Sequence, residues 1–208
     1  MNINGLPISI SEYKLIMHRR TAAIYNYFKQ SKDMDDRPGY WNDDGSPENP
    51  IKKLRETVEE ELVRIKVIQG LAIKNGLLED GSYTAFLRSL NIENERRRNA
   101  LVARQPIYGP QRHREAAYYY ILLGDLDHKL QGLMAREPGH EIPEAAILAY
   151  YNAHKDEIGQ RTLAEVRLKI IQVLQKQTYD KMISDLCVQA KIEKNIQALQ
   201  EVTPRSDT

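Results

Sequence analysis

Residues 149–171, AYYNAHKDEIGQRTLAEVRLKII, contain the joint that decides how this chain folds. The apolar periodicity of one helix ends near Ile158, and residues 159–161, Gly-Gln-Arg, separate it from the next. A glycine at this point favours the left-handed conformation that ends many helices. Thr162, with Glu165 three residues later, forms the capping-box pattern that begins one. The sequence therefore predicts two helices joined by only three residues.

Helical periodicity extends from this joint over most of the chain. Apolar residues recur at spacings of three and four, which is typical of amphipathic helices. The predicted helices are about Ser9–Gln30, Pro50–Gly76, Ser82–Ala103, Gln111–Arg136, Pro143–Ile158 and Thr162–Cys187. Residues 2–8 and the segment around Ile192 are short enough for at most two small strands. The predicted class is all-α, an irregular bundle of about six helices with long N- and C-terminal helices.

Length and charge limit the domain organisation and the partners. The 208 residues suffice for one large domain, which we predict over residues 1–200, with a polar loop at 31–50 and a disordered tail at 201–208. The 30 basic and 29 acidic residues give a net charge of +1, so no overall field attracts nucleic acid. The run of arginines at 96–98 is flanked by Glu93 and Glu95 and indicates an exposed helix face. No stretch approaches the roughly 20 apolar residues of a membrane span.

A search for catalytic chemistry finds no local constellation. There is no glycine-rich phosphate loop and no nucleophile-elbow or HExxH motif. His113 with Glu115, and Asp125 with His128, are too few ligands for a closed metal shell. Cys187 lies on the apolar stripe of the last helix, which favours a packed thiol over a nucleophile. The loop carries an acidic cluster without EF-hand spacing: Asp33, Asp35, Asp36, Asp43 and Asp44. We predict no catalytic residue, no metal and no cofactor.

Four segments, taken in order, carry a resemblance that extends over about residues 2–195. They are NGLPISISEY (4–13), IKKLRETVEEELVRIKVIQGLAIKNGL (51–77), EIPEAAILAYYNAHKDEI (141–158) and TLAEVRLKIIQVLQKQTYDKMISDLCVQAKIEKN (162–195). Their order resembles that of the SurA/PrsA-type extracytoplasmic foldases. Each motif is a helix-packing pattern, so the order of the segments carries the resemblance.

The joint at 159–161 is where this chain departs from that family. A parvulin domain, the prolyl isomerase, usually lies between the corresponding two helices, and here three residues stand in its place. The resemblance therefore implies the helical chaperone module alone, similar to the SurA N-terminal domain, without isomerase activity. It also implies that the N-terminal and closing segments pack together, with Ile3 near a strand around Ile192.

A module that cradles unfolded chains needs exposed apolar and aromatic side chains. The chain has 12 tyrosines, against two phenylalanines and one tryptophan. Three consecutive tyrosines cover most of a helix circumference, so at least one is expected to face outward or into a groove. The alternative is one packing residue with two surface neighbours. The candidate client contacts are Tyr27, Tyr40, Trp41, Tyr118, Tyr119 and Tyr120.

The leading functional prediction is a chaperone or foldase module that binds unfolded or nascent secreted polypeptides without catalysis. The alternative is a structural or assembly protein that uses the same helices for homodimerisation or for one dedicated protein partner. An enzyme using the helix that contains His113 and His128 is a third hypothesis. The resemblance implies an extracytoplasmic location after removal of a signal or anchor, with a membrane contact only through that anchor; a cytoplasmic location is the alternative.

Overall fold

The computed structural model describes residues 1–35, 39–42, 45, 48–137, 139 and 141–204. Within them the chain forms eight helices and three short strands. The helices are α1 (Ile10–Lys32), α2 (Pro50–Lys74), α3 (Tyr83–Val102), α4 (Glu115–Met134), α5 (Glu144–Ala153), α6 (Lys155–Ile158), α7 (Leu163–Val188) and α8 (Ile196–Gln200). The strands are β1 (Asn2–Ile3), β2 (Leu6–Pro7) and β3 (Ile192–Glu193). The predicted all-α class, with long N- and C-terminal helices, is confirmed.

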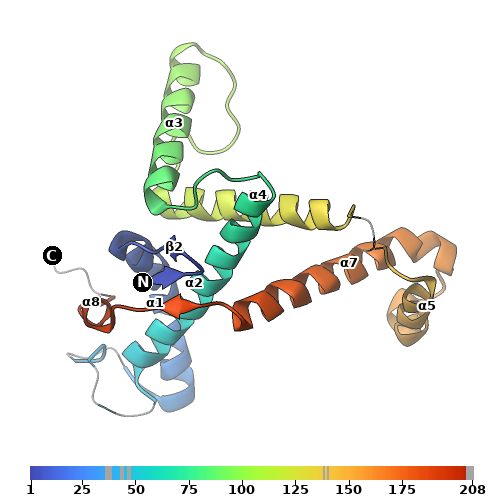
Figure 1. The fold of residues 1–208 in the computed structure, drawn as a ribbon, viewed down its shortest axis with the longest axis horizontal. Helices are drawn as coiled ribbons and strands as arrows, with labels where there is room; N and C mark the ends of the chain where they lie inside the picture. Colours follow the sequence, from blue (N-terminus) through green and yellow to red (C-terminus); the bar gives the residue numbers. More distant parts are fainter. Residues whose placement is uncertain (36–38, 43–44, 46–47, 138, 140, 205–208) are drawn as a thin grey trace.

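The molecule has an open, three-armed shape (Figure 1). α1 and α2 form one lobe, from which α2 crosses towards the centre. α3 projects as a second arm, with the segment after it folded back along its side. α7 runs outward as the third arm and carries α5 at its far end. α4 crosses the centre between the second and third arms, so it borders the open space between them.

The main hydrophobic core is built on α2. Twelve of the 25 residues of α2 are buried, among them Leu54, Val58 and Leu62 at helical spacing. α1 packs along this helix, and the C-terminal half of α7 joins it through Tyr179 and Ile183. This core fixes the centre of the molecule, from which the arms extend.

A second, smaller core lies at the far end of α7. Ile147 of α5 packs there against Val166 and Ile170 of α7. Arg167 and Glu144 form an ion pair across the same two helices. α7 is therefore a bridge, with one half in each core.

The two ends of the chain meet in a small antiparallel sheet with strand order β2-β1-β3. Ile3 pairs with Ile192, so the predicted contact of the termini is confirmed. Asn4 and Gly5 both have positive φ, 52° and 85°, as the type I′ turn of a tight hairpin requires. This turn adds β2, so the sheet has three strands where the sequence analysis allowed two.

The joint at 159–161 is an ordinary helix connection. Gly159 has φ 69° and ends α6, and Thr162 with Glu165 forms the predicted capping box of α7. Arg161 Nε donates to the carbonyl of Ile158 at 3.0 Å, and its own carbonyl accepts from the Tyr151 hydroxyl at 2.9 Å. These bonds turn the chain back, so that α5 packs against α7.

Two short helices depart from the sequence prediction: α6 is the end of the single helix expected over Pro143–Ile158, and α8 was not expected. α6 has four residues and is separated from α5 by His154, whose φ of −115° departs from helical geometry. α8 has five residues and is capped by Asn195, whose side chain accepts a hydrogen bond from the backbone of Ala198. A helix as short as α8 carries no apolar stripe, so periodicity cannot reveal it, and periodicity does not show a break of one residue such as that at His154.

The start of α4 also differs from the prediction, at Glu115 and not near Gln111. The residues before it are tied to the α3 arm. The Asn94 side chain accepts from the His113 amide at 2.8 Å and donates to its carbonyl at 3.1 Å. Arg97 donates to two further carbonyls of this segment, those of Tyr108 and Pro110. These contacts take the place of helical hydrogen bonds before Glu115.

The described chain stays ordered past the predicted domain end at residue 200. Leu199 of α8 and Val202 are buried in the main core. Residues 205–208, the rest of the predicted disordered tail, lie outside the described residues. Among the described residues, no helix combines the length and apolar character needed to cross a membrane.

Candidate functional site

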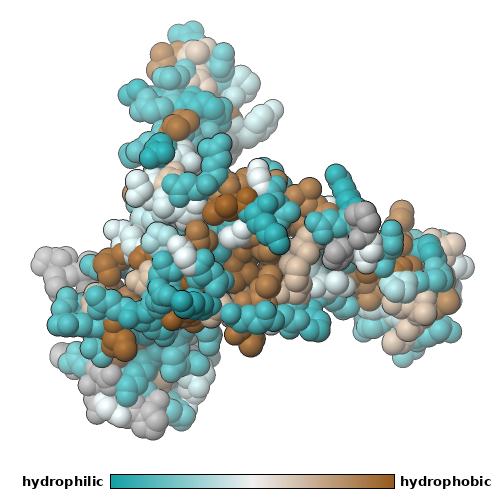
Figure 2. Space-filling view, viewed as in Figure 1, coloured by the Kyte–Doolittle hydropathy of each residue, from teal (hydrophilic) through white to brown (hydrophobic). Residues whose placement is uncertain are grey.

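α4 has many more hydrophobic residues than buried ones. Twelve of its 20 residues are hydrophobic, yet only Tyr119, Leu126 and Leu130 are buried. Ile121 is 51% exposed and Leu133 is 38% exposed. A helix that is apolar around most of its circumference is normally covered by other elements. Figure 2 shows hydrophobic residues gathered over the centre of the molecule, where α4 lies, between arms with mostly hydrophilic surfaces.

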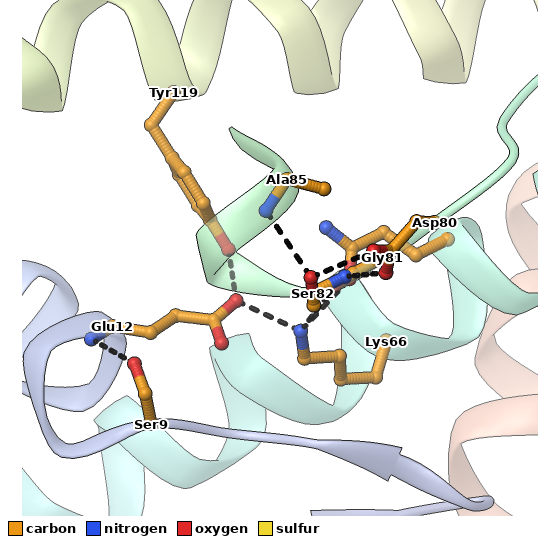
Figure 3. A network of polar contacts seen from close by, with 9 residues as sticks. Ser9, Glu12, Lys66, Asp80, Gly81, Ser82, Ala85 and Tyr119 are labelled. Atoms are coloured by element: carbon orange, nitrogen blue, oxygen red, sulfur yellow. Dashed lines mark hydrogen bonds and ion pairs between the residues drawn. The ribbon is translucent and has the colours of Figure 1, made fainter. Parts of the chain in front are cut away.

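A buried polar network attaches α4 to α1 and α2 (Figure 3). The Tyr119 hydroxyl points from α4 to Glu12 of α1 and donates to Oε1 at 2.5 Å. Lys66 of α2 donates to the same oxygen at 2.9 Å, to Gln69 Oε1 at 2.9 Å and to the Gly81 carbonyl at 3.0 Å. Lys66 and Glu12 are fully buried, and all three ammonium protons have an acceptor. The network therefore joins three helices and the α2–α3 turn at one point.

The chemistry of this network favours a fixed geometry over reactivity. Burial, reinforced by the Glu12 carboxylate, raises the pKa of Tyr119 well above its usual value, so the phenol stays protonated and donates. The second carboxylate oxygen of Glu12 has no hydrogen-bond partner among the described residues. A charge buried in this way is tolerated only while its partner is in place. The network consequently fixes the position of α4 with respect to α1 and α2.

One hollow lies on the side of α4 that faces α3. It has a volume of about 200 Å³ and lies between α4, the α2–α3 turn and the start of α3. Its apolar lining is formed by Leu77, Leu78, Ala85, Phe86, Tyr119, Leu122, Leu123 and Leu126. Asp80, Asp125 and Lys129 line its polar part. The volume is below the roughly 300–1,000 Å³ of a small-molecule site, so it suits part of a ligand, such as one side chain.

A larger, more open groove lies between α1 and the first turns of α4. Its volume is about 740 Å³. α1 contributes Ser11, Leu15, His18 and Arg19, and the α4 side contributes Arg114, Glu115, Ala116, Ala117 and Tyr120. We call this the α1/α4 groove. Its floor is apolar, and its basic side chains are on the rim.

The three consecutive tyrosines have three different environments. Tyr119 is buried in the main core, so one of the three tyrosines is a packing residue, as the alternative reading of the run predicted. Tyr118 is half-buried, with its ring 5.1 Å from that of His113. Tyr120 lines the α1/α4 groove, which confirms that one of the three faces a groove. Tyr119 also contributes to the wall of the hollow between α3 and α4, but it is only 2% exposed, so it offers a client almost no surface.

The other predicted contacts lie apart from α4. Tyr40 is buried, and its ring packs edge-to-face on Trp41 and on Tyr25. Tyr27 on α1 is 50% exposed and lines neither hollow beside α4. The structure therefore does not bring the six predicted residues into one site. Tyr120 is the one that lines a described hollow as an accessible side chain.

The residues considered for catalysis and metal binding are dispersed. The His113 ring is buried, and Glu115 accepts a hydrogen bond from Tyr83. Burial raises the pKa of the Cys187 thiol, which favours the protonated thiol over the nucleophilic thiolate. Within the part of the chain that the structure describes, no three His, Cys, Asp or Glu side chains gather into a metal-binding group.

The acidic loop is described only in part. Asp33 adopts the left-handed conformation at the end of α1, and Asp35 pairs with Lys29. Asp36, Asp43 and Asp44 lie outside the described residues.

Sequence reasoning missed the groove residues and the buried ion pair. Ser9 and Glu12 have capping spacing, and Ser9 does accept from the Glu12 amide, but the Glu12 carboxylate turns inward to Lys66. Lys66, between Ile65 and Val67 in an apolar run, was the available signal for a buried charge. The adjacent alanines 116 and 117, whose side chains are single methyl groups, were the available signal for the α1/α4 groove. Neither signal identifies its partner on another helix.

No protein-family model, no curated protein and no solved structure matches this chain. The resemblance to SurA/PrsA-type foldases therefore stays a prediction, and the function has to be argued from the site.

Proposed function

We propose that this chain is a chaperone-type module that binds unfolded or nascent polypeptide segments along α4, without prolyl isomerase catalysis. The observation that carries the proposal is the apolar composition of α4. Of its 12 hydrophobic residues, three are buried, five are partly buried against the main core, and four are exposed: Ala116, Ala117, Ile121 and Leu133. Contiguous exposed apolar surface on a soluble protein is typical of an interaction site.

The surroundings of α4 suit an extended, variable partner. The two hollows lie on different sides of the helix: the smaller, of about 200 Å³, has room for one side chain, and the more open groove, of about 740 Å³, has room for several residues of an extended chain. The buried network holds α4 in place, which lowers the entropy cost of binding. Hydrophilic arms on both sides of the apolar centre help to keep such a surface soluble (Figure 2).

The first experiment measures aggregation of a chemically denatured client by light scattering, with and without the protein. We expect the wild type to suppress aggregation. Ile121→Asp on α4 should weaken suppression, because it puts a charge on the exposed apolar surface. Ile92→Asp, at an exposed apolar position of α3, is the matched control and should leave suppression unchanged. No suppression by the wild type, or equal loss in both variants, would contradict the proposal.

The non-catalytic half of the proposal has its own assay. The rate of cis–trans isomerisation of a proline tetrapeptide should be the same with and without the protein. Catalysis of that step would show that an isomerase site exists without a parvulin domain, and would overturn this half alone.

The rival function is homodimerisation or binding to one dedicated partner. It is favoured by the outer arm, where Leu148 of α5 and Leu168 of α7 are exposed. Light scattering coupled to size-exclusion chromatography distinguishes the two. A concentration-independent dimer that is indifferent to denatured clients would favour the rival. The extracytoplasmic location implied by the resemblance stays a prediction.

A further inference from the structure

We propose that the α1/α4 groove selects polypeptide segments in which an acidic side chain neighbours an apolar one. This rests on the proposed function and specifies its client. The groove combines an apolar floor with basic side chains that have no carboxylate partner, and that combination defines the complementary ligand.

The floor of the groove is apolar and shallow. Leu15 and the Tyr120 ring are half-buried, and Ala116 and Ala117 present only methyl groups. Leu15 and Arg19 are four residues apart and lie on one face of α1, as do Ala116 and Tyr120 on α4. Two helix faces lined in this way leave room for an apolar side chain of a bound segment.

The charge of the groove is positive. Arg19 and Arg114 form no ion pair with a carboxylate among the described residues, and His18 adds an imidazole to the lining. The one acidic residue in the lining, Glu115, accepts a hydrogen bond from Tyr83 of α3 and keeps its negative charge, so the two arginines leave the lining with a net positive charge. Because the whole chain has a net charge of only +1, this is a local property of the groove.

Arg19 is held in place before any ligand arrives. Its guanidinium carbon lies 3.5 Å from the centre of the Tyr120 ring. The Tyr120 hydroxyl donates to Glu61 Oε1 at 2.7 Å, and Glu61 also pairs with Arg20. A guanidinium stacked on an aromatic ring keeps its N–H edge free for a carboxylate. An arginine fixed without a carboxylate partner is suited to bind one from outside.

An aspartate or glutamate within a client segment fits this arrangement better than a chain terminus. Ser11, Arg19, Arg114 and both alanines are exposed, so the groove is open and a bound chain can continue beyond it. The neutral overall charge does not favour nucleic acid. The occupant is therefore an extended internal segment with an apolar and an acidic residue side by side.

The test uses labelled peptides with amidated C-termini that differ at one position, Leu-Glu, Leu-Gln or Leu-Lys, and measures binding by fluorescence anisotropy. At about 0.05 M salt the Glu peptide should bind about two- to five-fold more tightly than the Gln peptide, and the Lys peptide most weakly. At about 0.5 M salt this preference should largely disappear, because salt screens exposed charges.

Three variants locate the preference. Arg114→Gln and Arg19→Gln should each reduce the preference for Glu over Gln while leaving the affinity for the Gln peptide unchanged. Arg136→Gln, at an exposed arginine beyond the other end of α4, is the matched control and should keep the preference. The exposed Arg114 side chain makes no hydrogen bond, ion pair or ring contact among the described residues, so its variant tests the charge without disturbing the Arg19–Tyr120 stack.

The outcomes separate this inference from the proposed function. Equal binding of the Glu and Gln peptides, or a preference that survives in both groove variants, overturns the inference and leaves the chaperone function standing. A preference for a free C-terminal carboxylate, lost on amidation, overturns the choice of an internal segment. No binding of any peptide, together with no suppression of aggregation, overturns the proposed function itself.

Discussion

Replacing Lys66 by methionine tests whether the buried network fixes α4. The side chain keeps a similar length, but the ammonium that donates to Glu12, Gln69 and Gly81 is lost. The Glu12 carboxylate then stays fully buried with a single hydrogen bond, from Tyr119 at 2.5 Å. We therefore expect Lys66→Met to destabilise the whole fold and not only its immediate surroundings.

The magnitude follows from the burial of both charges. Removing one partner of a buried ion pair costs about 3–5 kcal/mol, because the other charge is left uncompensated. Domains have a free energy of unfolding of about 5–15 kcal/mol, so this loss is a large fraction of it. For a chain of this length the melting temperature should fall by about 6–20 °C.

Chemical denaturation followed by far-UV circular dichroism measures the change. The control is Lys176→Met, which removes a surface pair with Asp180 and should change the free energy of unfolding by less than about 0.5 kcal/mol. The double variant Glu12→Gln with Lys66→Met should be more stable than Lys66→Met alone, because no unpaired charge remains. A Lys66→Met protein within about 1 kcal/mol of the wild type would refute the reasoning.

Two further predictions concern the α3 arm. Arg97→Met should accelerate tryptic cleavage within residues 103–114, because Arg97 donates hydrogen bonds to two carbonyls of that segment. Arg98→Met, at an exposed arginine, is the control. Equal cleavage of both variants would contradict the role of Arg97. Burial, reinforced by nearby Arg97, lowers the pKa of His113, so the folded state resists protonation there and stability is lost as the pH falls below the usual histidine value of about 6.5. His113→Phe, which keeps a ring against Tyr118, should reduce the fall in unfolding free energy between about pH 7 and pH 5, and an unchanged pH profile would exclude His113 as its source.

Local sequence signals predicted the elements well where the physics is local. Pro50 begins α2, Ser82 and Thr162 cap α3 and α7, and Gly159 ends α6, because each of these effects acts within one helical turn. The start of α4 was predicted too early, because contacts from Asn94 and Arg97 on another helix override the local preference.

The candidate site was only partly predictable. Tyr120 was selected from its place in a run of tyrosines, and it does line the α1/α4 groove. Tyr119 was selected by the same reasoning and is buried, because a residue's neighbours on other helices decide its exposure. Arg19 stacks on Tyr120, and Lys66 pairs with Glu12. Both partners lie on other helices, so no spacing along the chain reveals these contacts.

The sequence by itself determined the all-α class, the helix caps, the three-residue joint at 159–161 and the meeting of the two termini. These follow from backbone conformation and apolar periodicity, which act over a few residues, and, for the termini, from a resemblance in segment order. Only the tertiary structure decided that four hydrophobic residues of α4 stay exposed and that Glu12 and Lys66 meet inside the core. The reason is that burial depends on which helices pack together, and several arrangements are compatible with the same amphipathic stripes.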